Sequence, residues 1–248
     1  MSTDGVAESY ETYADQVEQP RFTDWLRERS EPTWTDAVEH RFTQELVDGT
    51  LDDDVMARYL VQDYAFVNTL VGTFARAVEG APTMAEKRRL IEFLDAITSD
   101  ENEYFKRSFD ALDVPESERT DPELAPATAA FEDLLVRAGE EGGYAETLAV
   151  LVPAEWIYLE WANGVDEPPE QFYLAEWIEL HAIPSFRSFV EWLREELDRV
   201  GPTLSPRRQQ RVAELFERTV DLEAAFFDAA YEPSPPSLRT TEPSEGRS

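Results

Sequence analysis

Apolar residues recur at spacings of three and four along most of the 248-residue chain, and this periodicity constrains the fold more than any other feature. Such spacing places them on one face of an α-helix, whereas the alternation that marks a half-buried strand is scarce. The pattern predicts a series of helices with short connections, at residues 21–30, 33–48, 52–79, 83–111, 122–139, 143–163, 169–199 and 205–231. Long helices with short connections favour a single-domain, antiparallel all-α bundle.

Residues at the predicted helix ends support these boundaries. Asp52 begins an acidic run suited to the N-terminus of a helix. Thr83 and Glu86 have the spacing of a capping box, and Ser205 followed by Pro206 is typical of a helix start. The helix starts at about 52, 83 and 205 are therefore supported by local chemistry as well as by periodicity.

Composition also sets the domain limits. We expect a flexible segment at 1–19, a helical domain at 20–231 and a disordered tail rich in Pro and Ser at 232–248. Pro153 and Pro184 fall inside predicted helices, where proline removes a backbone hydrogen bond, so each should distort its helix.

The charge balance excludes several classes of partner. There are 53 acidic and 22 basic residues, a net charge of −31, which would repel nucleic-acid phosphates and anionic lipid headgroups. Aromatic residues make up 12% of the chain, too many for a disordered acidic protein. With no basic start, signal peptide or long apolar run, we expect a halophilic, cytoplasmic protein that binds neither nucleic acid nor membrane.

Cysteine is absent and there are two histidines, which limits the chemistry available. Disulfides, thiolate metal sites, cysteine nucleophiles and histidine-rich metal cages are excluded. We therefore expect a site without metal or cofactor.

Protonatable residues interrupt the apolar stripes of four different predicted helices: Asp63, Glu155, His181 and Glu223. A structural role remains open for each of them, as a buried ion pair, a cap or a satisfied core histidine. Buried carboxyl groups have raised pKa values and can exchange protons near neutrality. Their occurrence together indicates a pocket in the bundle core for a small, flat, polar ligand, held between aromatic residues such as Phe66, Tyr158 and Phe226.

The segment LVPAEWIYLEW at 151–161 contains two glutamates with different expected roles. Glu155 shares a helix face with Tyr158 and follows the proline, which favours a place in the site. Glu160 lies about 140° away on the helix and is expected to be structural. His40 groups with polar residues and is expected to be solvated.

The chain resembles the TenA, or thiaminase II, family, whose members adopt a heme-oxygenase-like helical fold. The resemblance covers about residues 22–231 and rests on YLVQDYAFV after a Gly-Thr-Leu turn, on LVPAEWIYLEWA, on YLAEWIELH and on DLEAAFFDAAY, in that order. It implies hydrolysis of aminopyrimidines to hydroxymethylpyrimidine in thiamin salvage, and a homo-oligomer, a dimer or tetramer.

The resemblance also implies residue roles. Asp63 would hydrogen-bond the pyrimidine amino edge, and Glu223 would protonate a ring nitrogen. Tyr158 would stand near the reacting centre, His181 at the place of a second site tyrosine, and Phe226 would stack on the ring. We also place Phe66 and Phe131 among the substrate-binding residues.

One departure from the family concerns the nucleophile. Ala154 stands where one branch of the family has a cysteine, so a covalent thiolate adduct is impossible. Pro153-Ala154-Glu155 resembles the branch that carries a glutamate instead, which favours water attack on aminomethyl- or formylaminomethyl-pyrimidines and disfavours thiaminase activity. Glu155 would then handle the water or the leaving group.

Two alternatives remain open from the sequence. The first is a pyrimidine- or thiamin-binding protein without catalysis, which has kept the pocket but lost turnover. The second is a di-iron oxygenase on the same fold, although the chain has no Glu-x-x-His element of the kind that helical di-iron sites use.

Overall fold

The computed structural model describes residues 6–232, apart from the side chain of Asp100, and all regular structure in that part of the chain is helical. This confirms the predicted all-α class. The α-helices of the described residues are α1 (Tyr10–Ala14), α2 (Phe22–Arg29), α3 (Thr33–Val38), α4 (Arg41–Val47), α5 (Asp53–Gly80), α6 (Met84–Ala96), α7 (Asn102–Ala111), α8 (Glu116–Thr120), α9 (Pro126–Glu141), α10 (Tyr144–Ala162), α11 (Phe172–Ala182), α12 (Pro184–Val200) and α13 (Pro206–Ala229). A π-helical turn, η1 (Ile97–Glu101), joins α6 to α7, and a 3₁₀ turn, η2 (Gly201–Thr203), precedes α13.

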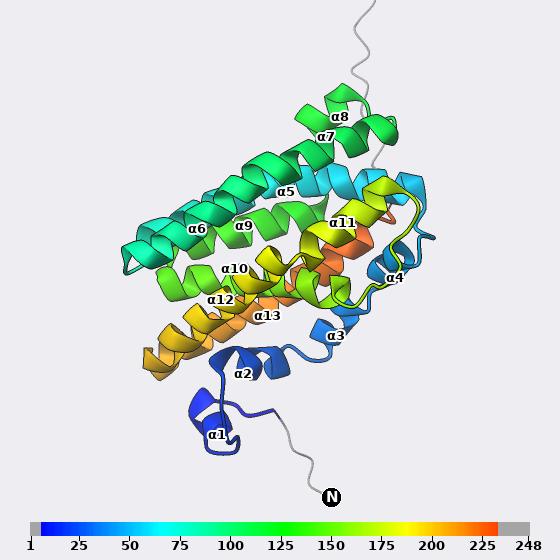
Figure 1. Cartoon of the computed structure of the whole chain (residues 1–248). Helices are drawn as coiled ribbons and strands as arrows, with labels where there is room; N and C mark the ends of the chain where they lie inside the picture. The colour runs from blue at the N-terminus through cyan, green and yellow to red at the C-terminus, as the bar shows by residue number, and fades with distance from the viewer. Residues whose placement is uncertain (1–5, 233–248) are drawn as a thin grey trace, which may run out of the picture.

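Helix α10 is the central element of the bundle (Figure 1). It packs against α5, α9, α11, α12 and α13, and residues 145–158 are all buried. A helix that is apolar all round belongs in the middle of a bundle, because every face must be covered. Two carboxylates of this helix, Glu146 and Glu155, are therefore inside the protein.

Several helix ends follow the predicted local chemistry. The Asp52 side chain caps α5, and Thr83 and Glu86 form the capping box of α6. Ser205 precedes α13, with Pro206 as its first residue. Helix α10 continues through Pro153 without interruption, so the expected distortion there does not break the helix.

Two predicted helices are interrupted by non-helical residues, and the helix predicted at 83–111 is divided by the π-helical turn η1 into α6 and α7. The helix expected at 169–199 ends at Ala182, because Ile183 is extended (ψ 150°), as residues before proline tend to be, and Pro184 begins α12. The helix expected at 33–48 is interrupted at His40. This side chain, expected to be solvated, instead accepts a hydrogen bond from the Phe42 N–H and caps α4.

The described part of the N-terminal segment differs from the flexible segment predicted at 1–19. Residues 10–14 form α1, the Tyr13 ring is buried, and the Trp25 indole donates a hydrogen bond to the Ala7 carbonyl. The aromatic rings of this segment have a place in the core against α2, and burial of such rings offsets the entropy of ordering the chain. The predicted tail at 232–248 lies, apart from Glu232, outside the described residues.

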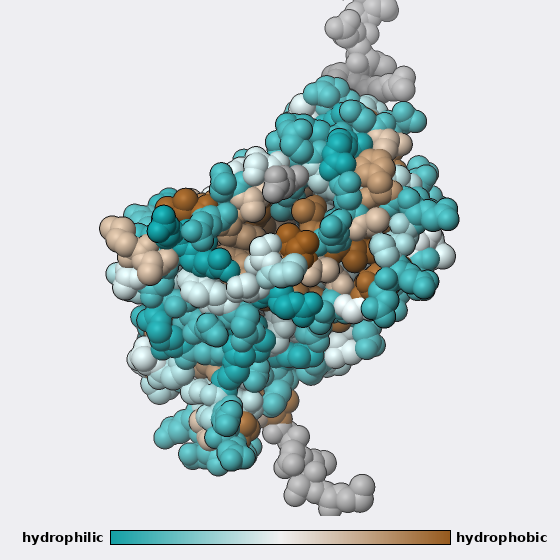
Figure 2. Space-filling view, viewed as in Figure 1, coloured by the Kyte–Doolittle hydropathy of each residue, from teal (hydrophilic) through white to brown (hydrophobic). Residues whose placement is uncertain are grey.

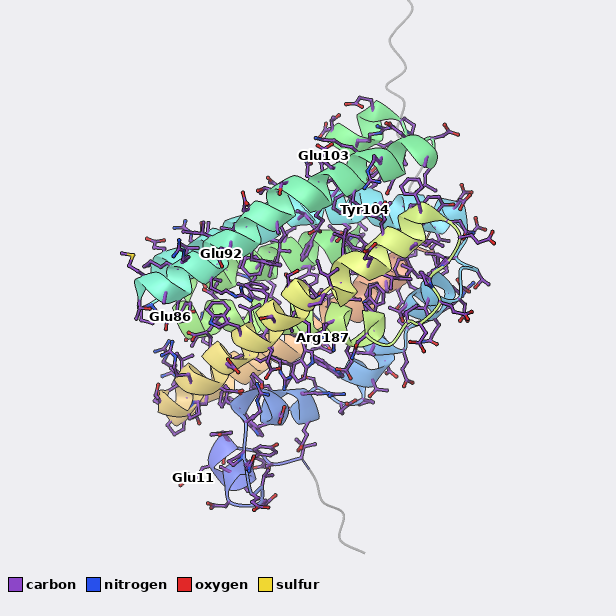
Figure 3. The ribbon with its side chains drawn as sticks, viewed as in Figure 1. Glu11, Glu86, Glu92, Glu103, Tyr104 and Arg187 are labelled. Atoms are coloured by element: carbon purple, nitrogen blue, oxygen red, sulfur yellow. The ribbon has the colours of Figure 1, made fainter. Side chains whose placement is uncertain are left out.

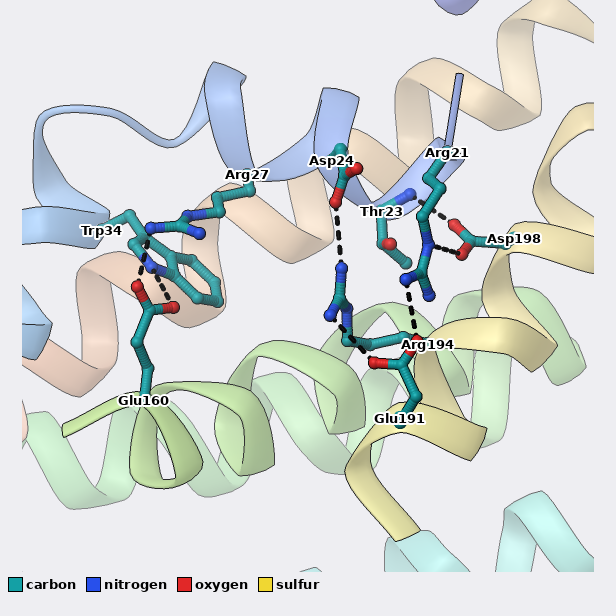
Figure 4. A network of polar contacts seen from close by, with 9 residues as sticks. All are labelled: Arg21, Thr23, Asp24, Arg27, Trp34, Glu160, Glu191, Arg194 and Asp198. Atoms are coloured by element: carbon teal, nitrogen blue, oxygen red, sulfur yellow. Dashed lines mark hydrogen bonds and ion pairs between the residues drawn. The ribbon is translucent and has the colours of Figure 1, made fainter. Parts of the chain in front are cut away.

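Ion pairs connect α2 to α10 and α12 (Figure 4). Arg21 pairs with Asp198 at 2.6 Å and with Glu191 at 2.8 Å, and Arg194 pairs with Glu191 and with Asp24 at 2.9 Å. This arginine network holds the short N-terminal helices on the bundle.

Candidate active site

A cavity of about 230 Å³ enters the bundle between α6–η1 on one side and α11–α12 on the other. Figure 2 shows this opening as a recess with hydrophobic atoms at its base and hydrophilic residues around it. A cavity of about 150 Å³ holds benzene, so this one has room for a single six-membered ring with small substituents. The cavity is therefore suited to a flat, monocyclic ligand, as predicted from the aromatic stripes.

Three predicted carboxylates line this cavity together, each from a different helix. Asp63 comes from α5, Glu155 from α10 and Glu223 from α13, and their exposed fractions are 4%, 6% and 2%. Among the described residues none of the three forms an ion pair, and Asp63 Oδ2 has no hydrogen-bond partner. Buried carboxylates without partners are unfavourable, so they point to a ligand or to bound protons.

Burial raises the pKa of all three carboxyl groups well above the ordinary range. For Glu223 the nearby charges of Asp63 and Glu155 add to the effect of burial. For Glu155 and Asp63 the charge of Glu101 adds to it, while the Tyr59 hydroxyl partly opposes the rise at Asp63. A raised pKa moves the titration of a carboxyl group toward neutral pH, where the group can accept a proton from water or donate one to a ring nitrogen.

A second glutamate of α10 shows what a structural carboxylate looks like in the same helix. Glu146 is as buried as Glu155, but it accepts hydrogen bonds from the Arg208 guanidinium at 2.7 and 3.0 Å and from the Gly143 N–H. Burial would raise its pKa, but these donors lower it overall. Glu155 has no comparable partner among the described residues, which distinguishes it as a residue available to a ligand.

Glu160 has the structural role predicted for it. Its carboxylate accepts from Arg27 Nη2 at 2.7 Å and from the Trp34 indole at 3.2 Å (Figure 4). Ala154, next to Glu155, does line the cavity, and it is the position that the resemblance matches to a cysteine in one branch of the family. The two glutamates of the segment at 151–161 therefore have separate environments.

Tyr158 and His181 line the cavity from α10 and α11. The Tyr158 hydroxyl lies 2.8 Å from that of Tyr59, and the His181 ring packs edge-on against Trp177. His181 Nδ1 donates to the Trp177 carbonyl, and burial lowers its pKa to about 4. The imidazole is therefore neutral near pH 7, with Nε2 as a hydrogen-bond acceptor.

The predicted aromatic residues lie at different depths. Phe66 lines the cavity, whereas Phe131 and Phe226 are not among its lining residues. They pack behind Phe66, with ring centroids 4.6 and 5.8 Å from it. A helical stripe predicts which face is buried but not how far each ring is from a ligand, so the two phenylalanines support the wall in this structure.

Several lining residues were not anticipated from the sequence. They include Glu101 on η1, together with Arg89, Phe93, Trp177, Phe186 and Phe189. Glu101 lies in an acidic run, where it looks like one more surface carboxylate. The one local signal for it is the π-helical turn, a rare form that often occurs at functional sites, and a π turn cannot be predicted from periodicity.

The described residues contain neither a cluster of metal ligands nor a membrane-spanning helix. In residues 6–232 no three His, Asp or Glu side chains are grouped as the ligands of one metal ion would be. No helix in the same range is both long and apolar enough to cross a bilayer.

The fold and cavity define an all-α bundle protein with an acidic, aromatic ligand site in its core. The chain belongs to the TENA/THI-4/PQQC family, whose model matches residues 27–233. Two curated relatives are named aminopyrimidine aminohydrolase: one from Halalkalibacterium halodurans, 24% identical over 83% of this chain and 93% of its own, and one from Helicobacter pylori, 25% identical over 84% and 97%.

Solved structures agree on the fold. A TenA homologue from P. horikoshii OT3 superposes with a TM-score of 0.75 at 24% identity, over 86% of this chain and 99% of its own. A heme-oxygenase-like domain from Shewanella denitrificans superposes with a TM-score of 0.56 at 14% identity, over 84% and 91%. The predicted heme-oxygenase-like fold is confirmed.

Proposed function

We propose that this protein hydrolyses aminomethyl- or formylaminomethyl-pyrimidines to hydroxymethylpyrimidine in thiamin salvage, without a cysteine nucleophile. The observation that carries the proposal is the convergence of Asp63, Glu155 and Glu223 on a cavity with room for one aromatic ring; all three are buried and have no ion-pair partner among the described residues. The aminopyrimidine aminohydrolase relatives support the same substrate class.

Asp63 and Glu223 are proposed to bind the two polar edges of the pyrimidine. Asp63 accepts a hydrogen bond from the exocyclic amino group, for which its unpartnered Oδ2 is suited. Glu223, with its raised pKa, carries a proton that it donates to a ring nitrogen. Protonation makes the ring more electron-withdrawing, and this activates the CH₂ carbon that carries the leaving nitrogen for substitution.

Glu155 is proposed to act on the water and the leaving group. Its carboxyl group lies beside Ala154, so water can occupy the space that a cysteine side chain would take. For a protonated aminomethyl substrate the balanced reaction is R–CH₂–NH₃⁺ + H₂O → R–CH₂–OH + NH₄⁺. Glu155 orients the water and takes up its proton, which is the usual task of a general base.

Phe66, Tyr158 and His181 are proposed to hold the ring, because all three line the cavity. Phe131 and Phe226 fix the position of Phe66 from behind. His181 Nε2 can accept a hydrogen bond from the substrate, because the other ring nitrogen, Nδ1, already donates to the Trp177 carbonyl.

Localisation, salt adaptation and oligomeric state are part of the same proposal. We propose a cytoplasmic protein adapted to high salt, because of its net charge of −31, and a homo-oligomer. Sedimentation at high salt would measure the assembly.

The test is turnover of aminomethylpyrimidine, formylaminomethylpyrimidine and thiamin at high salt, measured as release of hydroxymethylpyrimidine. Glu155→Gln should lower kcat by about 10²- to 10⁴-fold. Glu160→Gln is the matched control in the same helix, because Glu160 pairs with Arg27 away from the cavity, and its activity should stay within about twofold of the wild type. Unchanged activity in Glu155→Gln would contradict the role given to Glu155. Binding of these pyrimidines without any turnover by the wild type would favour the non-catalytic alternative.

A further inference from the structure

Glu101 is a fourth carboxylate in the cavity, and none of the roles above uses it. It is the last residue of the π-helical turn between α6 and α7, and it lines the cavity from the wall formed by those helices. Its side chain is partly buried, whereas Asp63, Glu155 and Glu223 are buried. Glu101 therefore reaches the cavity from a wall that none of the other three residues occupies.

Glu101 also has no neutralising partner in the part of the chain that is described. The basic side chain lining the cavity, Arg89, donates to Ser188 Oγ at 3.0 Å and lies 3.8 Å from a Glu92 oxygen at the opening. His181 is neutral near pH 7. In the described residues five carboxyl groups and one guanidinium therefore line the cavity. Burial raises the pKa of Glu101 to about 8, so a ligand that brings positive charge would bind there by displacing a proton.

The two proposed substrates differ in the charge of their substituent. An aminomethyl group is a primary alkylamine and, like the Lys side chain, is protonated at neutral pH. The N-formyl derivative is an amide and is neutral. A carboxylate placed near the substituent nitrogen would thus distinguish the two substrates by charge.

Glu101 is placed suitably for this contact. The ring edges and the water are assigned to Asp63, Glu223 and Glu155, which approach from α5, α13 and α10. Glu101 approaches from another wall, and it is close enough to Asp63 and Glu155 for its charge to raise the pKa of both, after the larger effect of burial. A substituent that projects from the ring toward η1 would meet Glu101.

We propose that Glu101 binds the ammonium group of an aminomethyl substituent and makes the site prefer the cationic amine over the neutral N-formyl amide. This inference rests on the proposed function, whose site it completes. The nitrogen held by Glu101 is the one that leaves: the C–N bond breaks with its electron pair on nitrogen, water oxygen bonds to the carbon, and the proton taken from water leaves with ammonia as NH₄⁺.

The experiment measures binding by calorimetry and turnover by product release. The ligands are aminomethylpyrimidine, its N-formyl derivative and hydroxymethylpyrimidine. The proteins are wild type, Glu101→Gln, Glu101→Asp and Glu103→Gln. Glu103 is the matched control, because it is two residues away, pairs with Lys106 and lies on the outer side of α7 (Figure 3).

Glu101→Gln should weaken binding of the amine about tenfold or more and raise its KM equally. Binding of the neutral N-formyl compound and of the alcohol should change less than about twofold, because neither has a charge to lose. Glu101→Asp retains the charge and should recover part of the affinity, and Glu103→Gln should match the wild type.

Each other result is decisive. Equal losses for all three ligands in Glu101→Gln would show a structural role, and no loss for the amine would show that Glu101 does not contact it; either overturns the inference. Amine binding that depends on Glu101 without turnover by the wild type would refute the proposed function and leave the inference standing. Wild-type protein that binds none of the three compounds would overturn both.

Discussion

At the scale of single residues, Glu146 and Glu155 are two buried carboxylates in one helix with opposite expected effects on stability. Glu146 has its charge neutralised by Arg208, and its pKa is lowered. Glu155 has no such partner among the described residues, and burial raises its pKa well above 4.5. The first carboxylate stabilises the fold, and the second is retained at the expense of stability, which is typical of residues that serve a ligand.

The matching prediction for Glu155 follows from proton linkage. The folded state binds its proton more tightly than the unfolded state, so the free energy of unfolding falls as pH rises from about 4.5 toward the folded-state pKa. Glu155→Gln removes this loss. We expect the variant to be more stable than the wild type by about 0.5–2 kcal/mol at pH 7, with the difference vanishing near pH 4, in urea unfolding across this pH range.

Glu146→Gln should behave in the opposite way. The folded state here favours the ionised form, so its contribution is fully present above the ordinary pKa of 4.5 and is lost as pH falls through the lowered value. We expect a loss of about 1–3 kcal/mol at pH 7 that shrinks toward acid pH. In the same urea experiment, the change in free energy of unfolding caused by each variant is followed against pH. The same pH dependence for both variants would show that pairing with Arg208 does not make the environment of Glu146 different from that of Glu155.

At the scale of helices, the arginine network of α2, α10 and α12 gives a prediction about how the N-terminal helices are held. Arg194 pairs with Asp24 and Glu191, and its guanidinium lies 3.7 Å from the centroid of the Trp156 ring. Its side chain is 14% exposed, so these contacts are weakly screened. Arg194→Met should lower the free energy of unfolding by about 1–3 kcal/mol.

Arg88→Met is the comparison for this variant. Arg88 is also helical and lies 3.7 Å from a glutamate, but its side chain is 82% exposed. Its loss should be below about 0.5 kcal/mol, because exposed ion pairs contribute little. Similar losses for the two variants in guanidinium or urea unfolding would mean that burial of the network adds nothing.

The same elements show how far periodicity predicts a bundle. It located the long helices, because each has an apolar face that must be buried. It missed the interruption at His40, because apolar residues continue on both sides and the break is made by a side chain capping the next helix. It also missed η1, because the apolar pattern alone does not show that the backbone hydrogen bonds change to π geometry.

The site was predictable to a similar degree. Asp63, Glu155, His181 and Glu223 stood out as polar residues within apolar stripes, and the structure brings all four to one cavity. Glu101 did not stand out, because its neighbours in the sequence are acidic as well. Phe131 and Phe226 were placed on the correct buried faces, yet depth within the core depends on packing between helices, which the periodicity of one helix does not contain.

At the scale of the whole molecule, the net charge of −31 opposes the compact state. Most of these charges are on the surface, where the Debye length falls from about 10 Å at 0.1 M salt to about 3 Å at 1 M. Raising KCl over this range and beyond should therefore stabilise the fold. In a domain of this length each kcal/mol raises Tm by about 2–4 °C, and we expect a rise of several degrees.

Calorimetric scans in KCl measure this, with a neutral osmolyte of equal osmolality as the control. The osmolyte changes water activity without screening charge, so it should produce a much smaller shift. The difference in Tm between Glu155→Gln and the wild type should not change with salt, because the carboxyl group of Glu155 is enclosed by protein and screened little by ions. A Tm that is unchanged by KCl, or raised equally by the osmolyte, would contradict surface repulsion as the force that salt relieves. A constant difference between the two proteins at every salt concentration would separate Glu155, which we propose serves a ligand, from the surface carboxylates, whose mutual repulsion salt screens.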